Sequence, residues 1–370
     1  MSRQRILHIL WDGGTGGAER FLKDITAFSD QTRFEHIVCF LSQGGWVTDE
    51  VIKGGIEVHV LGMKNGWFLP GAWRLWVLIR RVRPDLIHNH ALNYLANAAL
   101  RLFPGIPRMY FEHGGEFLAP KPSKEIVFYD LFGRYFDRIL ANSEFVRQRI
   151  LSLTKVDPAK VEVFYIGIDP LRHQRERDLK LRASLGIPEA HKVVGIIGRL
   201  VEMKGIDDFI RIAAEIRKLP KSFECSFLII GDGDLRPSLE ALAKELGVPV
   251  IFLGDRADVP DLLPLIDVLV FTSKWEPFGM VILEAMATRV PVVGFPTDGA
   301  AEIMAKGGAI AVRGRDVRQA AGAVVNLLEH PEKMREFGAQ GTRNVAANFD
   351  IRSSVKKLEA VYLDLLENRS

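Results

Sequence analysis

Short apolar runs alternate with longer amphipathic segments along almost the whole chain, and this alternation constrains the fold more than any other feature. The apolar runs end at Gly, Pro or Asp, as buried strands do, and the segments between them are long enough to be helices. Strands that alternate with helices form parallel sheets, because each connection must cross over the sheet. The sequence therefore predicts an α/β protein with doubly wound parallel sheets.

The pattern pauses once, in a charge-dense segment at residues 170–192 that holds a short helix ending at Gly186 and is typical of a domain linker. With 370 residues, the chain also exceeds the roughly 250 to 300 residues at which a single core stops growing. We therefore expect an N-terminal domain at residues 1–170 and a C-terminal domain at 171–350. The amphipathic segment at 351–370 either ends the second domain or crosses back to the first.

The expected elements follow from the same pattern. Strands are expected at residues 5–10, 36–41, 57–61, 86–88, 108–111, 138–141 and 160–165, and then at 193–197, 226–230, 250–252, 268–272, 290–294 and 309–312. Helices are expected at residues 18–28, 71–82, 94–103, 126–136, 143–153, 206–219, 235–246, 280–288, 317–328, 331–348 and 351–368.

The composition, with 48% hydrophobic and 26% charged residues, is that of an ordinary globular protein, and a net charge of +3 is too small to indicate a nucleic-acid partner. No run approaches the roughly 20 apolar residues of a membrane span. The N-terminal apolar run is also too short for a signal peptide. We expect a cytoplasmic protein that contacts the inner membrane face at most peripherally.

Two motifs in the second half point to a sugar nucleotide. The stretch from Gly198 to Gly205 follows an apolar run and places Arg199 and Lys204 around a glycine turn, where two cations can face a diphosphate. The stretch from Glu276 to Glu284 brings two carboxylates and the free backbone N–H groups of a helix start. Such N–H groups suit phosphate, and carboxylates accept hydrogen bonds from sugar and ribose hydroxyls. Burial of Glu284 without a partner would cost several kcal/mol, which indicates a ligand or partner.

The first half carries a glycine-rich turn from Gly13 to Glu19, between an expected strand and helix. Glycines there allow close approach of a backbone, and the helix N–H groups can meet a phosphate. A dinucleotide fingerprint ranks second, because the third glycine is missing and the second strand ends at Ser42 without an acid for a ribose. His113 follows the strand at 108–111, and the neighbouring Glu112 points to the opposite face, so Glu112 is not assigned as a nucleophile.

These motifs, in their order and spacing, resemble the retaining glycosyltransferases of family 4, and the resemblance covers nearly the whole chain. It rests on Gly16–Glu19, His88-x-His90, His113–Gly114, Ala141–Ser143, Gly167–Asp169, Gly198–Gly205, Gly231–Gly233 and Glu276–Ala287. The resemblance implies the GT-B fold, in which two Rossmann-like domains face a central cleft. It also implies that a sugar moves from a nucleoside diphosphate sugar, most often a UDP-sugar, to a hydroxyl of a glycan, a lipid-linked glycan or a smaller acceptor. No cofactor or metal would be needed, and substitution would occur on one face of the sugar.

The resemblance also assigns roles. Arg199 and Lys204 would hold the leaving diphosphate, Glu276 a hydroxyl of the transferred sugar, Glu284 the ribose, and His113 would lie beside the anomeric carbon. The predicted catalytic residues are His113, Arg199, Lys204 and Glu276. The predicted donor-binding residues are Gly16, Gly17, Arg199, Lys204, Gly231, Asp232, Glu276, Phe278, Gly279, Met280 and Glu284. The predicted acceptor-side residues are Glu19, His88 and His90.

Two groups of residues resemble metal sites, but neither is predicted to bind a metal. Asp232 and Asp234 form an Asp-x-Asp pair, but the flanking glycines directly after a strand favour a turn and a helix cap. His88, His90 and His113 lack the helical spacing and the cysteine ligands of a zinc site.

The window from Lys64 to Pro84 combines Trp67, Phe68, Trp73 and Trp76 with several basic residues and no acid. A basic, aromatic helix suits an anionic membrane surface, and a lipid-linked acceptor would fit this interpretation. The alternative is a helix that packs its leucines on the first domain, with its charges solvated.

Three other functions stay open from the sequence. One is a related two-domain enzyme, such as a sugar-nucleotide epimerase or a phosphorylase. Another is a protein that binds the donor without turnover. An NAD-dependent dehydrogenase is more distant.

Overall fold

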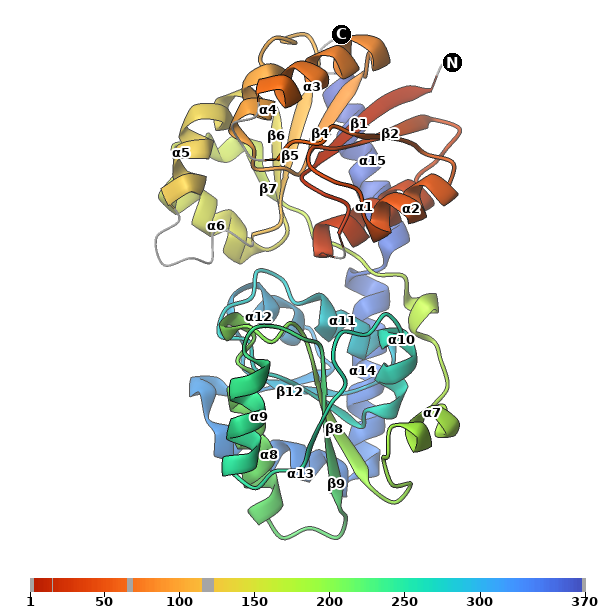
Figure 1. Ribbon diagram of the computed structural model, residues 1–370, viewed down its shortest axis with the longest axis vertical. Coiled ribbons are helices and arrows are strands. Elements are labelled where there is room, and N and C mark those ends of the chain that lie inside the picture. Colours follow the sequence, from red (N-terminus) through yellow and green to blue (C-terminus); the bar gives the residue numbers. More distant parts are fainter. Residues whose placement is uncertain (1–2, 15, 65–68, 115–122, 368–370) are drawn as a thin grey trace. The chain divides into compact units, whose positions relative to one another are not determined.

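The structure is a computed structural model that describes residues 3–14, 16–64, 69–114 and 123–367. The chain divides into two compact units (Figure 1). The N-terminal unit comprises Met1–Ile166 together with Ile351–Ser370, and the C-terminal unit comprises Gly167–Asp350. Each unit contains one parallel sheet, so the predicted α/β class with two doubly wound sheets is confirmed.

The N-terminal unit has a seven-stranded sheet in the order β3-β2-β1-β4-β5-β6-β7. Its strands are β1 (Gln4–Leu10), β2 (Phe34–Phe40), β3 (Glu57–Val60), β4 (Leu86–Asn89), β5 (Arg108–Glu112), β6 (Arg138–Ala141) and β7 (Val161–Val163). Its helices are α1 (Gly17–Phe28), α2 (Trp46–Lys53), α3 (Leu69–Val82), α4 (Tyr94–Leu100), α5 (Ser123–Phe132), α6 (Glu144–Leu153) and α15 (Ile351–Glu367). The strand order reverses between β1 and β4, which marks the switch point where a doubly wound sheet binds ligands.

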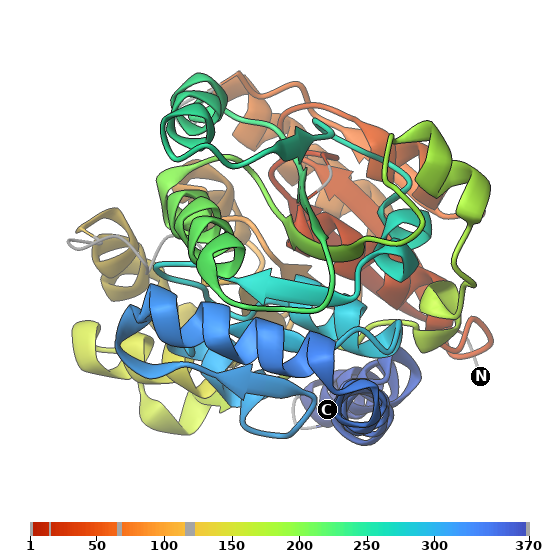
Figure 2. The same cartoon turned by 90° about the horizontal axis from the view of Figure 1, so that it is seen from below.

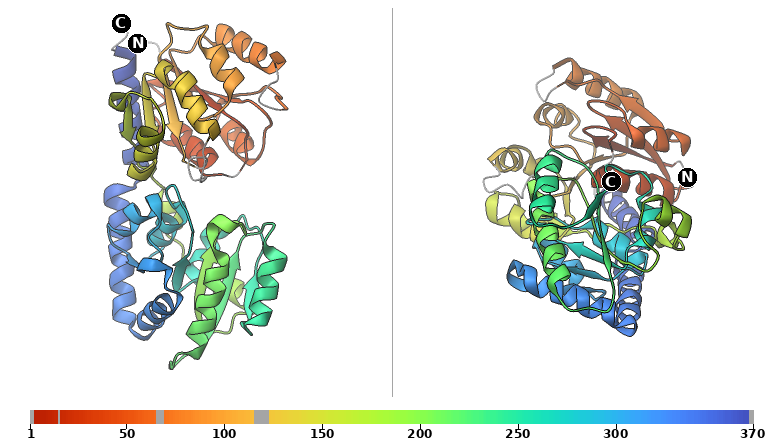
Figure 3. Two further views of the ribbon diagram at one scale, coloured as in Figure 1. Left: turned by 90° about the vertical axis from the view of Figure 1, so that its left-hand side faces the viewer. Right: turned by 60° about the horizontal axis from the view of Figure 1, so that its bottom comes forward.

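The last helix, α15, belongs to the N-terminal unit, and it runs along that unit in dark blue (Figure 3). Its Tyr362 hydroxyl lies 2.7 Å from Nδ1 of His88, and its Glu359 carboxylate accepts a 2.7 Å hydrogen bond from the Ser29 hydroxyl. Arg138 on β6 donates to Asp364 at 2.5 Å. The segment that follows the C-terminal unit in the sequence is thus held by the strands and helices of the N-terminal unit.

The C-terminal unit has a six-stranded sheet in the order β10-β9-β8-β11-β12-β13. Its strands are β8 (Lys192–Ile197), β9 (Cys225–Ile230), β10 (Val250–Phe252), β11 (Val268–Phe271), β12 (Val292–Gly294) and β13 (Ala309–Ala311). Its helices are α7 (Leu179–Ser184), α8 (Ile206–Lys218), α9 (Arg236–Glu245), α10 (Val259–Leu262), α11 (Met280–Ala287), α12 (Asp298–Met304), α13 (Val317–Glu329) and α14 (Pro331–Asn348). Here the strand order reverses between β8 and β11.

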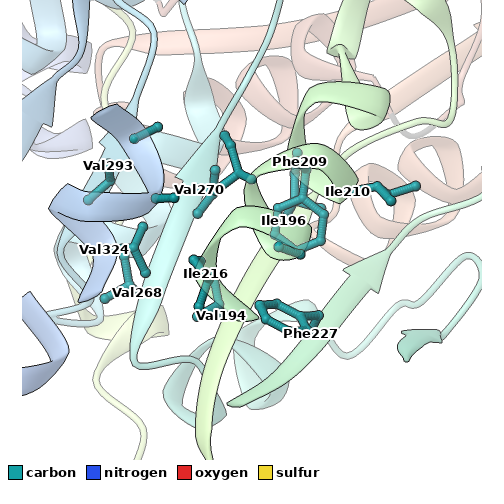
Figure 4. Close-up of a cluster of buried hydrophobic side chains, with 14 of the residues drawn as sticks. Val194, Ile196, Phe209, Ile210, Ile216, Phe227, Val268, Val270, Val293 and Val324 are labelled. Atoms are coloured by element: carbon teal, nitrogen blue, oxygen red, sulfur yellow. The ribbon is translucent and has the colours of Figure 1, made fainter. Parts of the chain in front are cut away.

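Helices lie on both sides of the C-terminal sheet (Figure 2). One face packs on α8, α9 and α13, and Figure 4 shows Val194, Phe209, Phe227 and Val324 in this layer. All four of these side chains are fully buried. Fully burying such a side chain stabilises the fold by about 1.5–3 kcal/mol, so this layer fixes the sheet that carries the loops described below.

No helix in the described part of the chain combines the length and the apolar composition needed to cross a bilayer.

Candidate active site

The two motifs of the C-terminal unit follow β8 and β11, the neighbouring strands on either side of its switch point. Because the strands are parallel, their carboxyl ends meet at the same edge of the sheet. The first motif approaches the end of β11 closely at Gly205. A Cβ placed on Gly205 would lie 2.3 Å from the Thr272 carbonyl oxygen, and Gly205 has a φ of 60°. Only glycine fits this contact, which brings the Gly198–Gly205 loop against the end of β11.

Lys204 and Glu276 form the central contact of this edge. The Nζ atom of Lys204 lies 2.5 Å from Oε2 of Glu276, and the Ser273 hydroxyl donates to the same oxygen at 3.1 Å. Both side chains are largely buried. The aliphatic stem of Lys204 lies beside Gly198, where an added Cβ would be 3.5 Å from Lys204 Cγ. A cation and a carboxylate are thus held side by side before any ligand arrives.

Arg199 is placed differently from Lys204. Its side chain is exposed and has no hydrogen-bond or ion-pair partner among the described residues. The neighbouring loop approaches it closely, because a Cβ on Gly231 would lie 2.1 Å from the Gly198 carbonyl oxygen. The structure therefore leaves the Arg199 guanidinium free to meet an anion.

Asp232 is engaged within its own loop. Its carboxylate accepts hydrogen bonds from the backbone N–H of Gly233 at 2.8 Å and from Arg236 at 3.0 Å. The Gly233 N–H is the main reason that the pKa of Asp232 lies below its usual value. The predicted turn is present, but the predicted helix cap is wrong: the residue before α9 is Leu235, because the chain makes a further turn before the helix begins.

The start of α11 lies in the loop that follows β11. Gly279 precedes the helix with a φ of 101°, and no side chain caps the first N–H groups of the helix. Phe278 is buried against Phe349, with ring centroids 5.9 Å apart, which fixes the approach to the helix. Met280 opens the helix, and Glu284 lies buried one turn further in. A helix start without a side-chain cap is compatible with the anion-binding role that the sequence predicts for it.

Sequence reasoning missed two residues that shape this edge. The Asp298 carboxylate accepts a 3.0 Å hydrogen bond from the Glu276 backbone N–H. Arg315 donates to the carbonyl oxygens of Ser273 and Thr272, at 2.9 and 2.8 Å, and also pairs with Asp208. Their positions in the sequence could have identified them. Asp298 follows β12 and Arg315 follows β13, so both come after strands that end at the same edge of the sheet.

In the N-terminal unit, the glycine turn follows β1 at the switch point beside β4. Gly16 is the residue before α1, and again no side chain caps the helix. A Cβ on Gly16 would lie 2.4 Å from Oε2 of Glu19 in the first helical turn. Burial raises the pKa of Glu19. Gly17 has open space around its Cα.

Five histidines gather on one face of the N-terminal sheet: His8, His36, His88, His90 and His113. His8 and His36 share a 2.9 Å hydrogen bond, and Nδ1 of His90 lies 3.2 Å from Nε2 of His113. His88 is fully buried and bonds Tyr362, so the predicted acceptor-side role of His88 is wrong, because it has no surface to offer an acceptor. His90 and His113 are half-buried at the carboxyl ends of their strands.

A ring nitrogen from each of His8, His88 and His90 lies within 4.8 Å of the other two. The rings of His88 and His90 are tilted towards each other, with centroids 4.0 Å apart and planes inclined by 32°. Burial keeps the pKa values of all three histidines well below the usual value, so their imidazoles are neutral at neutral pH.

The histidine cluster predicts an acid-sensitive fold. Burial lowers the pKa of His36 to about 4 and that of His113 to about 3, and it holds those of His8, His88 and His90 well below the usual value. Below pH ~6.5 the unfolded chain takes up protons that the folded chain refuses. The contribution of these histidines to the free energy of unfolding is therefore complete above pH ~6.5. The free energy of unfolding falls as the pH decreases towards 4, by up to about 1.4 kcal/mol per pH unit for each histidine.

Urea unfolding between pH 7.5 and 5 measures this slope, and His36→Phe should flatten it. A stability that stays constant from pH 6.5 to 5, where aspartates and glutamates contribute little, would contradict the prediction.

The Glu112 side chain is buried and hydrogen-bonded within the N-terminal unit. Its carboxylate accepts hydrogen bonds from the Gly114 backbone N–H at 2.7 Å and from the Tyr129 hydroxyl at 2.9 Å. The Asn142 side chain meanwhile donates to the His113 carbonyl oxygen at 2.7 Å. Glu112 therefore positions the His113–Gly114 turn and is not presented as a nucleophile.

The fold and this arrangement of loops define the GT-B class. The structure of Anabaena Alr3699/HepE in complex with UDP-glucose is similar over 98% of this chain and 100% of that chain, with a TM-score of 0.85 and 24% identity. Two family models match consecutive parts of the sequence: Glycosyltransferase Family 4 at residues 15–172 and Glycosyl transferases group 1 at residues 178–344. The chain belongs to the glycosyltransferases of family 4.

Proteins with similar sequences are also named as glycosyltransferases. An uncharacterised glycosyltransferase of Methanocaldococcus jannaschii is 31% identical over 60% of this chain and 60% of its own length. The D-inositol 3-phosphate glycosyltransferase 2 of Catenulispora acidiphila is 29% identical over 79% of this chain and 68% of its own length.

Proposed function

We propose that this protein transfers a sugar from a UDP-sugar to a hydroxyl group of an acceptor, with retention of the anomeric configuration and without a metal ion. The observation that carries the proposal is the buried contact between Lys204 and Glu276, beside the open N-terminus of α11. The choice of UDP is supported by the complex of Alr3699/HepE with UDP-glucose. The choice of a hydroxyl acceptor is supported by relatives named D-inositol 3-phosphate glycosyltransferase.

The leaving diphosphate develops negative charge as its bond to the sugar breaks, and this charge must be stabilised. Lys204 is held in place by Glu276, and Arg199 on the same loop is an exposed guanidinium with no partner among the described residues. The N–H groups of Gly279 and Met280 add donors at the start of α11. One cation held in place, one exposed cation and a helix start together supply the role that a divalent ion has in other transferases.

The carboxylates select the hydroxyl groups of the donor. We assign Glu276 to a hydroxyl of the sugar, because its second oxygen is not used by Lys204 or Ser273. We assign Glu284, buried one turn inside α11, to the ribose. Gly231 and Asp232 border the nucleotide through the turn that follows β9.

Same-face substitution is proposed as the route to retention, because no carboxylate in the described part of the chain is placed as a nucleophile. Glu112 is occupied by Tyr129 and Gly114. The acceptor hydroxyl would attack on the face that the diphosphate leaves: its oxygen bonds to the anomeric carbon, the bond to the phosphate oxygen breaks, and the proton passes to that phosphate oxygen. We assign His113 to the sugar, and Gly16, Gly17, Glu19 and His90 to the phosphate and acceptor side.

The test is incubation with a panel of UDP-sugars and acceptor alcohols, in which released UDP is measured and the product is analysed by NMR. The proposal expects UDP release that needs both substrates and a product with the anomeric configuration of the donor. An inverted product would contradict the mechanism. Interconversion of UDP-sugars without an acceptor would indicate an epimerase, dependence on inorganic phosphate a phosphorylase, and tight binding without turnover a binding protein.

We further propose a cytoplasmic location with peripheral membrane contact through α3. Leu69, Trp73 and Val77 form an exposed apolar stripe on this helix, one turn apart from each other. Trp73 stacks on Trp76 at 4.8 Å, and Arg80 lies over the Trp76 ring at 5.0 Å. The opposite face packs its leucines on the sheet, so the two interpretations of this helix are compatible. Trp67 and Phe68 lie outside the described residues.

This contact predicts binding to anionic vesicles. The stripe would enter the bilayer interface, and each nearby cation would add about 1 kcal/mol of attraction to an anionic surface. In co-sedimentation, the native chain should bind phosphatidylglycerol vesicles and not phosphatidylcholine vesicles. Trp73→Ser together with Val77→Ser should weaken binding at least tenfold, whereas Leu171→Ser, an exposed leucine of the other unit, should not. Equal binding by both variants would refute the assignment.

A further inference from the structure

A cavity lies within the C-terminal unit, away from the proposed donor loops. It has a volume of about 670 Å³ and is lined by the segment before α7, the residues that precede β11 and β12, and one side of α14. The donor loops follow β8 and β11, and β12 runs parallel to β11. The cavity therefore lies at the opposite edge of the sheet from the donor loops, and its size is that of a small-molecule site.

The lining of this cavity is strongly basic. It contains five arginines and one carboxylate, that of Asp267. This carboxylate is fully used, because it accepts hydrogen bonds from Arg177 at 2.8 Å and from the Val193 backbone N–H at 2.7 Å. Arg175 pairs with Asp261. The remaining positive charge of the cavity has no counterpart among the residues that line it.

Three of the arginines have no hydrogen-bond or ion-pair partner in the described part of the chain: Arg289, Arg335 and Arg343. Arg335 and Arg343 lie eight residues apart on α14, about 12 Å along its axis, with Ala339 between them. The small side chain between the two leaves the floor of the cavity open. Guanidinium groups at this spacing can each grip a separate phosphate through two parallel hydrogen bonds.

Arg289 occupies a backbone conformation that an arginine adopts only at a cost. Its φ is 62°, in the left-handed region that favours glycine, directly after the end of α11. The turn is fixed by packing, because a Cβ on Gly338 of α14 would lie 2.5 Å from the Arg289 carbonyl oxygen. A glycine would relieve the strain here, so the arginine at this position indicates a use for its side chain.

We propose that this cavity binds a soluble small molecule that carries two or more phosphate groups, held by Arg289, Arg335 and Arg343. The site is independent of the proposed sugar transfer. It is nevertheless joined to the donor loops by α11, which begins at the donor loop and ends at Ala287, about 12 Å away and two residues before Arg289. An anion bound at its end would act on the helix that carries Glu284.

The test is titration calorimetry with tripolyphosphate as the probe, in an Arg199→Ala and Lys204→Met background that removes the proposed phosphate-binding cations of the donor site. The proposal expects saturable binding that is lost in Arg335→Ala together with Arg343→Ala and at least tenfold weaker in Arg289→Gly. Arg289→Gly should melt at or above the temperature of its parent, because it removes backbone strain. Arg318→Ala, an exposed arginine on α13, should bind as the parent does.

Three results would overturn the proposal: no saturable binding by the parent chain, unchanged affinity in the α14 double variant, or equal loss in Arg318→Ala. Binding to phosphatidic acid vesicles without binding to tripolyphosphate would also overturn it, because the ligand would then be a lipid headgroup. A chain that binds tripolyphosphate in this way but transfers no sugar would leave this inference standing and refute the proposed function.

Discussion

Replacing Lys204 with methionine is expected to lower kcat for sugar transfer by about 10²- to 10³-fold, with a much smaller change in KM. Lys204 is held against Glu276 at 2.5 Å, so its charge is in position before the diphosphate leaves. A preorganised charge acts mainly on the transition state, where the negative charge develops. Methionine keeps the aliphatic stem that lies beside Gly198, so packing is preserved while the charge is lost. Steady-state kinetics with saturating acceptor measures the change.

The matched control is Lys218→Met, which removes an exposed lysine at the end of α8 in the same unit. It should leave kcat unchanged. An unaltered kcat in Lys204→Met would remove the cation from the mechanism, and an equal loss in both variants would show that the effect is not local.

Replacing Glu284 with alanine is expected to weaken UDP binding by about 100-fold. A hydrogen bond to a charged group contributes about 1.5–3 kcal/mol, and a ribose offers two hydroxyls to one carboxylate. Glu284 is buried in the middle of α11, so it stays close to the ligand without competition from water. Calorimetric titration of UDP measures the affinity, and the melting temperature of the free variant reports its folding.

Two further variants sharpen this prediction. Glu284→Gln keeps the volume and loses the charge, so its UDP affinity should fall between those of the native chain and the alanine variant. Glu240→Ala removes an exposed glutamate of α9 and should bind UDP as the native chain does. Native-like affinity in Glu284→Ala, with a folded protein, would rule out the ribose assignment.

The strands were predictable from the sequence because buried parallel strands are continuous apolar runs between turn residues. Every expected strand has a counterpart in the two sheets. The helices α2 and α12 were missed, because each is short and begins near glycines that resemble a loop: Gly45 before α2 and Gly299 within α12. Short helices of this kind are stabilised by packing rather than by a sequence pattern.

The proposed site was predictable where its residues share a loop, and less so where they meet across strands. The loops that carry Arg199, Lys204 and Glu276 follow strands that are predictable from the sequence. Only the fold shows that Lys204 pairs with Glu276, whereas Arg199 has no partner among the described residues. Arg315 was missed because its contacts reach back to carbonyl oxygens more than 40 residues earlier. Full burial of His88 depends on Tyr362, which comes from the far end of the sequence.

The most direct test of the central claim, that the C-terminal unit holds a nucleoside diphosphate, is thermal stability against UDP, GDP, ADP and NAD. It should be measured for the native chain, Arg199→Ala and Glu284→Ala. A ligand at 100 times its dissociation constant adds about 2.7 kcal/mol, which is readily seen as a rise in melting temperature. We predict a rise with UDP for the native chain that is lost in both variants. No rise with any nucleoside diphosphate, or a rise with NAD alone, would contradict the account.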